Sequence, residues 1–495
     1  MHAHRPPAAP TRPPAATPGR RRPRRANASA APPSAPPPPP AAAAGAPAAA
    51  GQQQDKPRWT GDGLLSRAVN GAIANPLLFG AMRVLAKGAM RRSARERGVD
   101  WAAHADAVAA RQREHLAPLA RAFAARSGLG MGPYGDDGDG DEGGEEGDGG
   151  RGRRATTAAA TATPPATTTP YPDYYLVPFH SYERGNLEWE AAREVEPASL
   201  AIAMRTFERD APAKDDARAT ARFAERAMAR MRGGITSAVR EYVTERRGLP
   251  APRRILDVGC STGISTRWLA AEFEAALARE EERRGEGRGA AAAAAEGPKP
   301  LDALVGLDLS PYFLAVAEDE ERRRWGDGED EAPSSSSPSS PSPSPSSALL
   351  GLRAAPRTLT RPSYVHGLAE RAPFPDASFD LVAFNFVAHE CPGRAIDAFC
   401  AEARRLLAPG KGVVYFSDND PASATIQNLP PAIFTLMKST EPWSDEYYAF
   451  SLEDALRRAG FKDVVKVASD HRHRVVMGVA PAAGGEEEEA GEGAA

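Results

Sequence analysis

The sequence predicts an α/β protein with a doubly wound, mostly parallel sheet. Residues 255–258 and 304–308 are short apolar segments that end near an acid and run into helix-start signals, as buried parallel strands do before crossover helices. A helical pattern at 402–410, closed by Pro-Gly, and an apolar segment at 413–416 continue the alternation. Alternating strands and helices form a sheet with right-handed crossovers, and such sheets bind ligands at the carboxyl ends of their strands.

The turn after the first of these strands is a candidate ligand loop. A phosphate-cradling loop would end in Gly-Lys-Ser/Thr, which is absent, and a dinucleotide fingerprint needs glycine where Ser261 stands. Glycines on both sides of this position let a ligand approach the backbone closely. A strand-turn-helix without a ligand is the alternative. The loop follows Asp257 and consists of Gly259, Cys260, Ser261, Thr262 and Gly263.

Asp308 ends the second strand and is the next candidate. In nucleoside-binding sheets an acid at this place binds the ribose hydroxyls about 20 residues after the glycine loop. The interval is longer here, and we interpret residues 280–300, which are charged and rich in Gly and Ala, as a surface insertion. Ser310 suits a helix N-cap and Pro311 the first helical position. A helix-capping or solvated acid is the alternative.

A third segment completes the pattern. Residues 367–382, GLAERAPFPDASFDLV, lead from one strand end through a Pro-Phe turn into the next strand. With the glycine loop and Asp308, this segment resembles the class I S-adenosylmethionine-dependent methyltransferases of the type 11 group, over residues 253–480. The resemblance is closest to the plant and algal plastid branch, in which the step His-Glu-Cys-Pro, here at 389–392, and the segment KSTEPW, here at 438–443, recur.

The resemblance implies a Rossmann-like sheet of seven strands, with residues 461–466 and 474–479 as a final antiparallel hairpin, and S-adenosylmethionine as the cofactor. In this family the acid ending the first strand receives the ligand's ammonium, directly or through water, and the loop backbone lies against the methionine portion of the ligand. The family usually has an acid where Leu368 stands, so adenine recognition would fall to backbone there. The implied cofactor-binding residues are Asp257, Gly259, Cys260, Ser261, Gly263, Asp308, Leu309, Leu368, Ala369 and Asn385.

His389 and Glu390 are the candidate catalytic residues, because they follow the fourth strand, where donor and acceptor should meet. Methyl transfer is an in-line displacement, and a base is needed only when the acceptor must lose a proton. His389 is then that base with Glu390 orienting it, or both are ordinary loop residues. Trp443, Tyr447 and Tyr448 offer flat surfaces to an aromatic or isoprenoid acceptor, with packing in a lid as the alternative. We expect no metal site, because no His and carboxylate cluster shows ligand spacing along the sequence.

The N-terminal segment has the composition of an organelle transit peptide. Residues 1–54 contain seven Arg and no Asp or Glu. We expect a chloroplast location, with the mitochondrion second and a generic basic tail as the alternative. The expected organisation is a disordered transit peptide at 1–56, a helical extension at 57–130, a disordered acidic and Thr/Pro-rich linker at 131–170, a helical cap at 171–250, the methyltransferase domain at 251–480 with a second insertion at 326–357, and an acidic tail at 481–495.

The N-terminal extension carries an amphipathic pattern. Leu78, Met82 and Leu85 recur at helical spacing, with basic residues elsewhere around the helix. This helix either packs on the catalytic domain or lies on a membrane surface, so peripheral membrane contact stays open. No apolar run approaches 18 residues, so we expect no membrane span. The sequence does not indicate an oligomeric state.

The predicted function is methyl transfer from S-adenosylmethionine to a small-molecule acceptor, such as a quinone, a phenol or an isoprenoid-type metabolite. The rival is a methyltransferase-like protein that serves as a binding or assembly factor without catalysis, because Ser261 replaces a glycine and Leu368 an acid. A nucleic-acid methylase is disfavoured, because Asn385 is not followed by the Pro-Pro-aromatic step that grips a flipped base. We therefore expect no nucleic-acid partner.

Overall fold

The structure is a computed structural model, and it leaves several segments outside its description. The described residues are 57, 59–60, 67, 71, 75–134, 171–213, 216–285, 298–326 and 356–483. The predictions for the transit peptide at 1–56, for linker residues 135–170 and for the tail from 484 onward lie outside them. So do residues 286–297 and 327–355, which hold most of the two predicted insertions.

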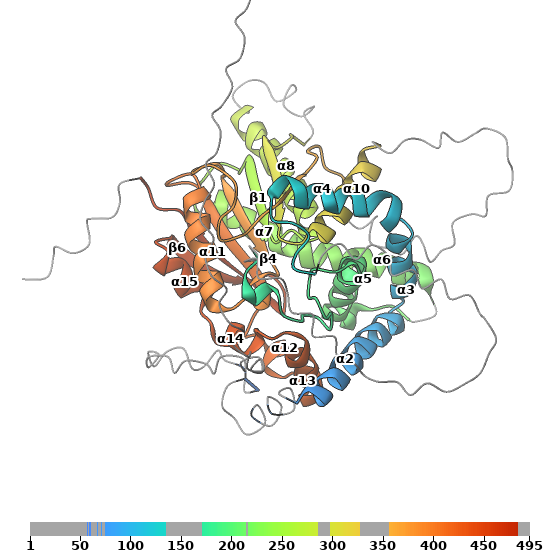
Figure 1. Ribbon diagram of the computed structural model, residues 1–495. Coiled ribbons are helices and arrows are strands. Elements are labelled where there is room, and N and C mark those ends of the chain that lie inside the picture. The colour runs from blue at the N-terminus through green and yellow to red at the C-terminus, as the bar shows by residue number, and fades with distance from the viewer. Residues whose placement is uncertain are drawn as a thin grey trace, which may run out of the picture. The chain divides into compact units, whose positions relative to one another are not determined.

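A seven-stranded sheet forms the core of the described chain (Figure 1). Its order is β3-β2-β1-β4-β5-β7-β6, and β7 runs antiparallel to both β5 and β6 while the other pairs are parallel. The doubly wound, mostly parallel sheet with a final hairpin is therefore confirmed. The strands are β1 (Arg254–Val258), β2 (Ala303–Asp308), β3 (Ser363–His366), β4 (Leu381–Asn385), β5 (Val413–Asn419), β6 (Lys462–Ala468) and β7 (His473–Val479).

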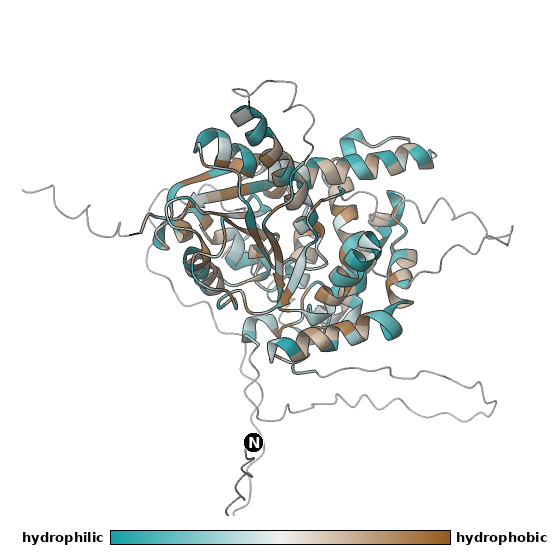
Figure 2. Ribbon diagram, turned by 90° about the horizontal axis from the view of Figure 1, so that it is seen from above, coloured by the Kyte–Doolittle hydropathy of each residue, from teal (hydrophilic) through white to brown (hydrophobic). Residues whose placement is uncertain are grey.

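Alternate strand residues pack against two different helical layers. Leu256 and Phe384 belong to one apolar cluster and Ile255 and Tyr415 to the other, as the two-residue period of a strand requires. Figure 2 shows the hydrophobic central strands beneath helices with hydrophilic outer faces. The layers are α11 (Gly393–Leu406) with α15 (Leu452–Arg458) on one face, and α7 (Gly234–Arg240) with α8 (Ile264–Gly285) on the other. Helix α11 begins well before the predicted 402–410, and α8 extends into the region predicted as the first insertion.

The N-terminal extension is helical where the structure describes it, and it packs on the domain that contains the sheet. Ser127, which ends α4, bonds through Oγ to Nδ1 of His366 in β3 at 2.7 Å, and α4 lies beside α10 (Figure 1). The predicted apolar face is wrong at Leu85, whose side chain is 65% exposed. The elements are α2 (Pro76–Glu96), α3 (Trp101–Ala109), the π-turn η1 (Gln112–Leu116), α4 (Ala117–Ser127) and, in the domain, α10 (Pro311–Trp325).

The predicted cap consists of an irregular arm followed by two long helical stretches. The arm contains η2 and a sharp turn at His180 and Ser181, both with positive φ. The second stretch is continuous but changes between α- and π-helical turns. Its elements are η2 (Asp173–Tyr175), α5 (Trp189–Thr206), η3 (Glu208–Asp210), α6 (Ala217–Met228), η4 (Ala229–Gly233), the α7 already named and η5 (Glu241–Arg246).

Three short helices follow β5. The aromatic residues of this region that could contact an acceptor or pack in a lid are part of the packing. Tyr447 and Tyr448 are fully buried in the main apolar cluster, and Trp443 packs against it. Trp59 stacks on Phe434 at 5.3 Å, which ties the N-terminal segment to this region. The helices are α12 (Ala424–Gln427), α13 (Pro431–Thr440) and α14 (Ser444–Ala449).

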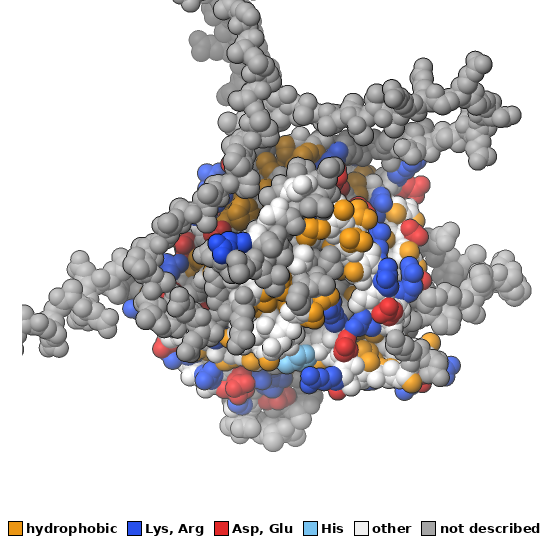
Figure 3. Space-filling view, turned by 90° about the horizontal axis from the view of Figure 1, so that it is seen from below, with side chains coloured by type: hydrophobic (Ala, Val, Ile, Leu, Met, Phe, Trp, Pro, Cys, Tyr) orange, Lys and Arg blue, Asp and Glu red, His pale blue; other side chains and the backbone are white. Residues whose placement is uncertain are grey.

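No helix in the described part of the chain is long and apolar enough to cross a membrane. On the face in Figure 3, basic and acidic side chains are interspersed with apolar ones, and neither sign of charge dominates that view.

Candidate active site

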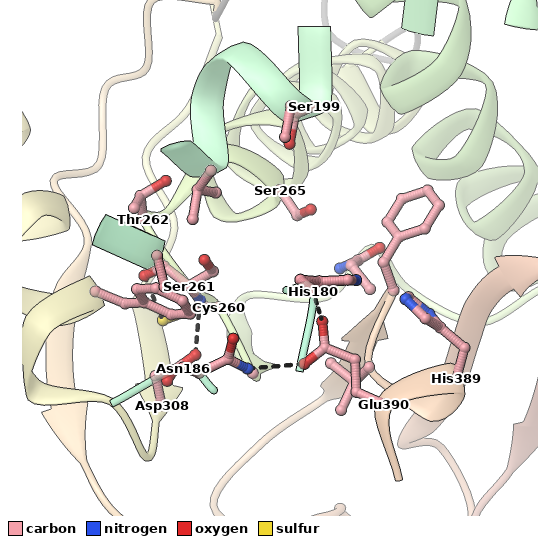
Figure 4. Close-up of a pocket in the computed structure, with 18 of the residues that line it drawn as sticks. His180, Asn186, Ser199, Cys260, Ser261, Thr262, Ser265, Asp308, His389 and Glu390 are labelled. Carbon is pink, nitrogen blue, oxygen red and sulfur yellow. Dashed lines mark hydrogen bonds and ion pairs between the residues drawn. The ribbon is translucent and has the colours of Figure 1, made fainter. Parts of the chain in front are cut away.

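A cavity of about 320 Å³ lies at the carboxyl ends of β1, β2 and β4. Figure 4 shows Cys260, Ser261 and Asp308 at one end of it and His180, His389 and Glu390 at the other. Most predicted site residues line it: Gly259, Cys260, Ser261, Asp308, Leu309, Ala369, Asn385, His389 and Glu390. Asp257, Gly263 and Leu368 are not part of its lining.

The glycine loop adopts a conformation that requires two of its glycines. Gly259 and Gly263 have φ of +68° and +76°. A Cβ on Gly259 would lie 2.4 Å from Val387 Cγ2, and one on Gly263 would lie 2.2 Å from the Tyr364 hydroxyl oxygen. Ser261 also has a positive φ, +51°, at a cost of roughly 1–2 kcal/mol for a residue with a Cβ. The serine is tolerated where glycine would be unstrained.

Asp257 lies beneath the cavity and holds its floor together. It is fully buried, and it accepts hydrogen bonds from Thr266 Oγ1 at 2.7 Å and from Asn385 Nδ2 at 3.0 Å. Asn385 Oδ1 in turn accepts from Tyr415 and Ser417. Burial raises the pKa of Asp257 to about 6, and its two hydrogen bonds oppose the shift. Because Asp257 is outside the cavity lining, the predicted contact of the ligand ammonium with it would have to be indirect.

Asp308 lines the cavity and orders the glycine loop. Its Oδ2 accepts the backbone N–H of Ser261 and its Oδ1 that of Ser310, both at 2.8 Å. Burial raises its pKa to about 6, although these backbone hydrogen bonds pull it down. A carboxylate has about four acceptor positions, so both oxygens retain capacity for ligand hydroxyls. Ser310 also caps α10, as predicted.

At the other end of the cavity, a short 3-10 turn after β4 places His389 and Glu390. His389 Nδ1 lies 3.0 Å from Oδ2 of Asp418, the residue before the last of β5, and the His389 backbone N–H donates to the same oxygen. Burial disfavours the charged imidazole, but the attraction and hydrogen bond of Asp418 raise the pKa of His389 to about 10. Glu390 accepts a hydrogen bond from Asn186 at 2.9 Å, and burial raises its pKa to about 7.

His180 joins this pair from a segment far away in the sequence, and sequence analysis did not find it. Its Nδ1 lies 4.0 Å from Glu390 Oε1 and its Nε2 4.0 Å from Glu441 Oε1. Its backbone N–H donates to the Thr440 carbonyl at 2.7 Å. Burial, with the neighbouring His389, lowers the pKa of His180 to about 3. The only sequence signal was the aromatic-rich arm around it.

The expectation of no metal site stays a prediction, but the fold gathers three potential ligands that spacing along the sequence did not connect. One potential ligand atom from each of His180, His389 and Glu390 lies within 4.8 Å of the others. Spacing along the chain could not reveal this group, because the arm brings His180 to the end of β4 only in the folded structure.

Two further polar residues that sequence analysis missed line the cavity. Arg232 from η4 is buried, donates through Nη1 to Ser265 Oγ at 2.6 Å, and stacks over the Phe386 ring. Its Nε has no hydrogen-bond partner among the described residues. Oε1 of Glu370 accepts a hydrogen bond from the Tyr174 hydroxyl. Its Oε2 is buried and has no hydrogen-bond partner among the residues that the structure describes.

Comparison with known proteins agrees with this geometry. Residues 344–416 match the family model described as "Methyltransferase domain". An uncharacterized methyltransferase of Synechocystis sp. is 32% identical over 128 residues, which are 24% of this chain and 59% of that relative. The chain thus spans less than two thirds of the length of this relative.

Solved methyltransferases are similar at lower identity. A SAM-dependent methyltransferase from Aquifex aeolicus is 14% identical, with a TM-score of 0.30, over 52% of this chain and 98% of that one. An O-methyltransferase family protein from Burkholderia thailandensis is 13% identical, with a TM-score of 0.31, over 58% of this chain and 72% of that one. The family match over residues 344–416 and the seven-stranded order show what the chain is similar to, a methyltransferase domain with a mostly parallel sheet. Its assignment to a plant or algal branch stays a prediction.

The loop geometry predicts opposite outcomes for two neighbouring substitutions. Gly259→Ala forces a Cβ against Val387 at a left-handed φ and should lower the free energy of unfolding by about 1–3 kcal/mol. Ser261→Gly removes the strained Cβ and should stay within about 1 kcal/mol of the parent, because relief of strain offsets the added freedom of the unfolded chain. Denaturant unfolding followed by circular dichroism measures both. Equal effects of the two changes would contradict the described loop.

Proposed function

We propose that the protein transfers a methyl group from S-adenosylmethionine to a small-molecule acceptor. One observation carries this proposal: a single cavity joins the glycine loop and Asp308 at one end to His180, His389 and Glu390 at the other. A sulfonium nucleoside seated on the loop would direct its methyl group toward these side chains. Alignment of donor and acceptor in such a cavity supplies much of the catalysis in a displacement of this kind.

The cavity offers partners for several parts of the cofactor. Asp308 can accept hydrogen bonds from the ribose hydroxyls. Asn385, whose Oδ1 already accepts two hydrogen bonds, would lie between the amino-acid portion of the ligand and Asp257. Arg232 has a buried, partly unpaired guanidinium, which suits the α-carboxylate of the methionine portion. We assign the adenine amino group to Glu370 Oε2 and the backbone of Ala369, which would replace the acid missing at Leu368.

The acceptor end combines apolar walls with a few polar groups. Tyr175, Ile202 and Phe386 line the cavity together with Glu390 and His389. Such a surface fits a flat or branched apolar molecule with one reactive oxygen or carbon, as in a quinol, a phenol or an isoprenoid-type metabolite. Because Asp418 fixes the imidazole of His389, that ring and Glu390 are placed to orient the acceptor.

We also propose that the protein acts in the plastid. The composition of residues 1–54 supports this location. A fluorescent fusion of these residues tests it in algal or plant cells. Fluorescence outside the plastid would contradict the location without affecting the proposed chemistry.

Methyl transfer is tested with purified protein, methyl-labelled S-adenosylmethionine and a metabolite extract. We expect a labelled small molecule and stoichiometric S-adenosylhomocysteine, read by mass spectrometry. Asp308→Ala should weaken cofactor binding about 10- to 100-fold, the cost of losing hydrogen bonds to a charged group. Asp376→Ala, an exposed acid outside the cavity, is the control. Cofactor binding without label transfer would favour the non-catalytic binding factor, and absence of binding would overturn the proposal.

Cofactor affinity should depend on pH through Asp308. Its carboxyl is protonated below its pKa of about 6, and only the ionised form accepts both ribose hydroxyls well. The Kd for S-adenosylhomocysteine should therefore fall as pH rises from about 5 to about 7, and Asp308→Asn should flatten the profile. Because the folded pKa lies above the ordinary value of 3.8, stability changes the other way: the free energy of unfolding decreases as pH rises through this window. Calorimetry at several pH values measures the affinity, and an unchanged Asp308→Asn profile would contradict the assignment.

Arg232 should discriminate ligands by their carboxylate. We expect Arg232→Ala to weaken S-adenosylhomocysteine about 10-fold or more while leaving 5′-methylthioadenosine, which lacks the amino-acid portion, nearly unchanged. Arg230→Ala is the matched control, because Arg230 lies on the same helical turn, is half exposed and pairs with Asp210. An equal loss of affinity for both ligands would mean that Arg232 stabilises the loop and does not bind the carboxylate.

A further inference from the structure

We propose that His180, His389 and Glu390 bind a divalent transition-metal ion at the acceptor end of the cavity. Two imidazoles and a carboxylate from one side of a site, with the remaining positions open, form a ligand set that zinc and ferrous iron use in enzymes. One potential ligand atom from each residue lies within 4.8 Å of the others. The side chains converge from the arm and from the turn after β4 (Figure 4).

The three ligand atoms, which lie within 4.8 Å of one another, must approach by up to about 1.4 Å to hold an ion. Ligand atoms about 2.1 Å from a tetrahedral ion lie about 3.4 Å from each other. His180 Nδ1 and Glu390 Oε1 are 4.0 Å apart, so this pair must close by less than an ångström. His180 has about a third of its side chain exposed, and it lies on an irregular arm whose residues can shift more easily than those of a strand.

Both histidines have a carboxylate beside the nitrogen that faces away from the site. Nδ1 of His389 bonds to Asp418, which leaves Nε2 for an ion. Nε2 of His180 lies 4.0 Å from Glu441, which leaves Nδ1, the nitrogen that faces Glu390. Metal-binding histidines usually donate their second N–H to a carboxylate, which fixes the ring and strengthens the ligand. His389 shows this arrangement with a hydrogen bond, and Glu441 lies at the corresponding place beside His180, at a distance too long for a hydrogen bond.

The carboxylate of Glu390 is also oriented by a neighbouring side chain. Asn186 donates to Oε2 at 2.9 Å, which turns Oε1 toward His180. Three carboxylates, from Glu390, Asp418 and Glu441, thus surround two imidazoles in a buried region, and Glu441 Oε2 has no hydrogen-bond partner within the described residues. Arg472 also lines the cavity, and its Nε donates to Asn419.

The backbone at His180 is strained, which indicates that surrounding contacts hold it in place. His180 and Ser181 both have positive φ, at 50° and 71°, although neither is glycine. Two successive residues in this region cost roughly 1–3 kcal/mol each and persist only where surrounding contacts impose them. The hydrogen bond from His180 N to the Thr440 carbonyl is one such contact. The strain aims the His180 ring into the cavity.

The chemical role of the ion rests on the proposed function. An acceptor hydroxyl bound to the metal becomes more acidic and can lose its proton to Glu441. The oxygen lone pair then forms the new bond to the methyl carbon, the bond from that carbon to sulfur breaks, and the electron pair stays on sulfur as the neutral thioether. An oxygen acceptor with a second donor atom nearby, such as an ortho-substituted phenol or a reduced quinone, would fit the open positions of the ion.

Metal binding is tested first, independently of catalysis. Chelator-treated full-length protein is titrated with Zn²⁺ and with Co²⁺, and we expect one ion per chain, a visible Co²⁺ absorption of a nitrogen- and oxygen-ligated site, and a higher melting temperature. Mg²⁺ should give neither binding nor stabilisation, because imidazole is a poor ligand for hard cations. His180→Ala and Glu390→Gln should each weaken Co²⁺ binding by at least about 100-fold.

The matched control is His104→Ala. His104 is another buried histidine that faces a carboxylate, that of Glu196 at 3.2 Å, but it lies outside this cavity. This variant should retain the full Co²⁺ signal, and loss of the signal there would overturn the site. Glu390→Gln keeps the shape of the side chain, so its melting temperature without metal reports whether the fold is intact.

Calorimetry with S-adenosylhomocysteine separates the two proposals. If the nucleoside binds to metal-free protein and no ion binds, the metal inference fails and the proposed function stands. If the ion binds and the nucleoside does not, the proposed function fails and the site remains a metal site. Label transfer that rises severalfold with Zn²⁺ or Fe²⁺, and that His180→Ala reduces to the metal-free rate, supports the catalytic role, and equal rates with and without metal contradict it.

Discussion

The buried carboxylate of Asp257 is the constraint on which the site depends. It cannot be left unpaired, because an isolated charge in the interior is strongly unfavourable. Thr266 from α8 and Asn385 from β4 satisfy it, and Asn385 is in turn fixed by Tyr415 and Ser417 of β5. One acid therefore links three neighbouring strands and the helix after the glycine loop. A fully satisfied polar network of this kind selects a single arrangement of the strand ends.

From this floor the two ends of the cavity are built by different means. The nucleoside end consists of strand ends and the loop between them, so local sequence determines it. The acceptor end is assembled from the arm, the turn after β4 and the segment around Glu441, which are distant in the chain. Helix α2 also reaches the cavity, since Lys87 and Met90 line it. The N-terminal extension is thus part of the acceptor side and not only a support for the sheet.

This difference explains what could be predicted from the sequence. The glycine turn and the position of Asp308 at a strand end follow from local patterns, the seven-stranded order was implied by the family resemblance, and the structure shows all three. His180 and Arg232 could not be found, because a histidine in an irregular arm and an arginine in a helix carry no periodic signal that separates them from surface residues. The interpretation of Tyr447 and Tyr448 as an acceptor surface failed for a different reason. An aromatic side chain suits a pocket and a core equally well, and only tertiary packing decides between them. The resemblance named a family, whereas these long-range contacts define what is particular to this chain.

The two ends of the cavity should therefore respond differently to substitution. Substitutions on the nucleoside side disturb Asp257 or the left-handed glycines, and so they threaten the sheet itself. The arm also contacts the sheet, because Tyr174 packs in the cluster that contains Leu256 and the Tyr171 hydroxyl lies 3.1 Å from Nε2 of His366 in β3. The group of His180, His389 and Glu390 therefore combines one residue from the arm with two from the turn after β4. Because Asp418 of β5 holds His389 by a hydrogen bond, the rigid sheet determines where the His389 ring lies in this group. Rigid placement of one ligand and adjustable placement of another is an arrangement that allows an acceptor to enter before the site closes around it.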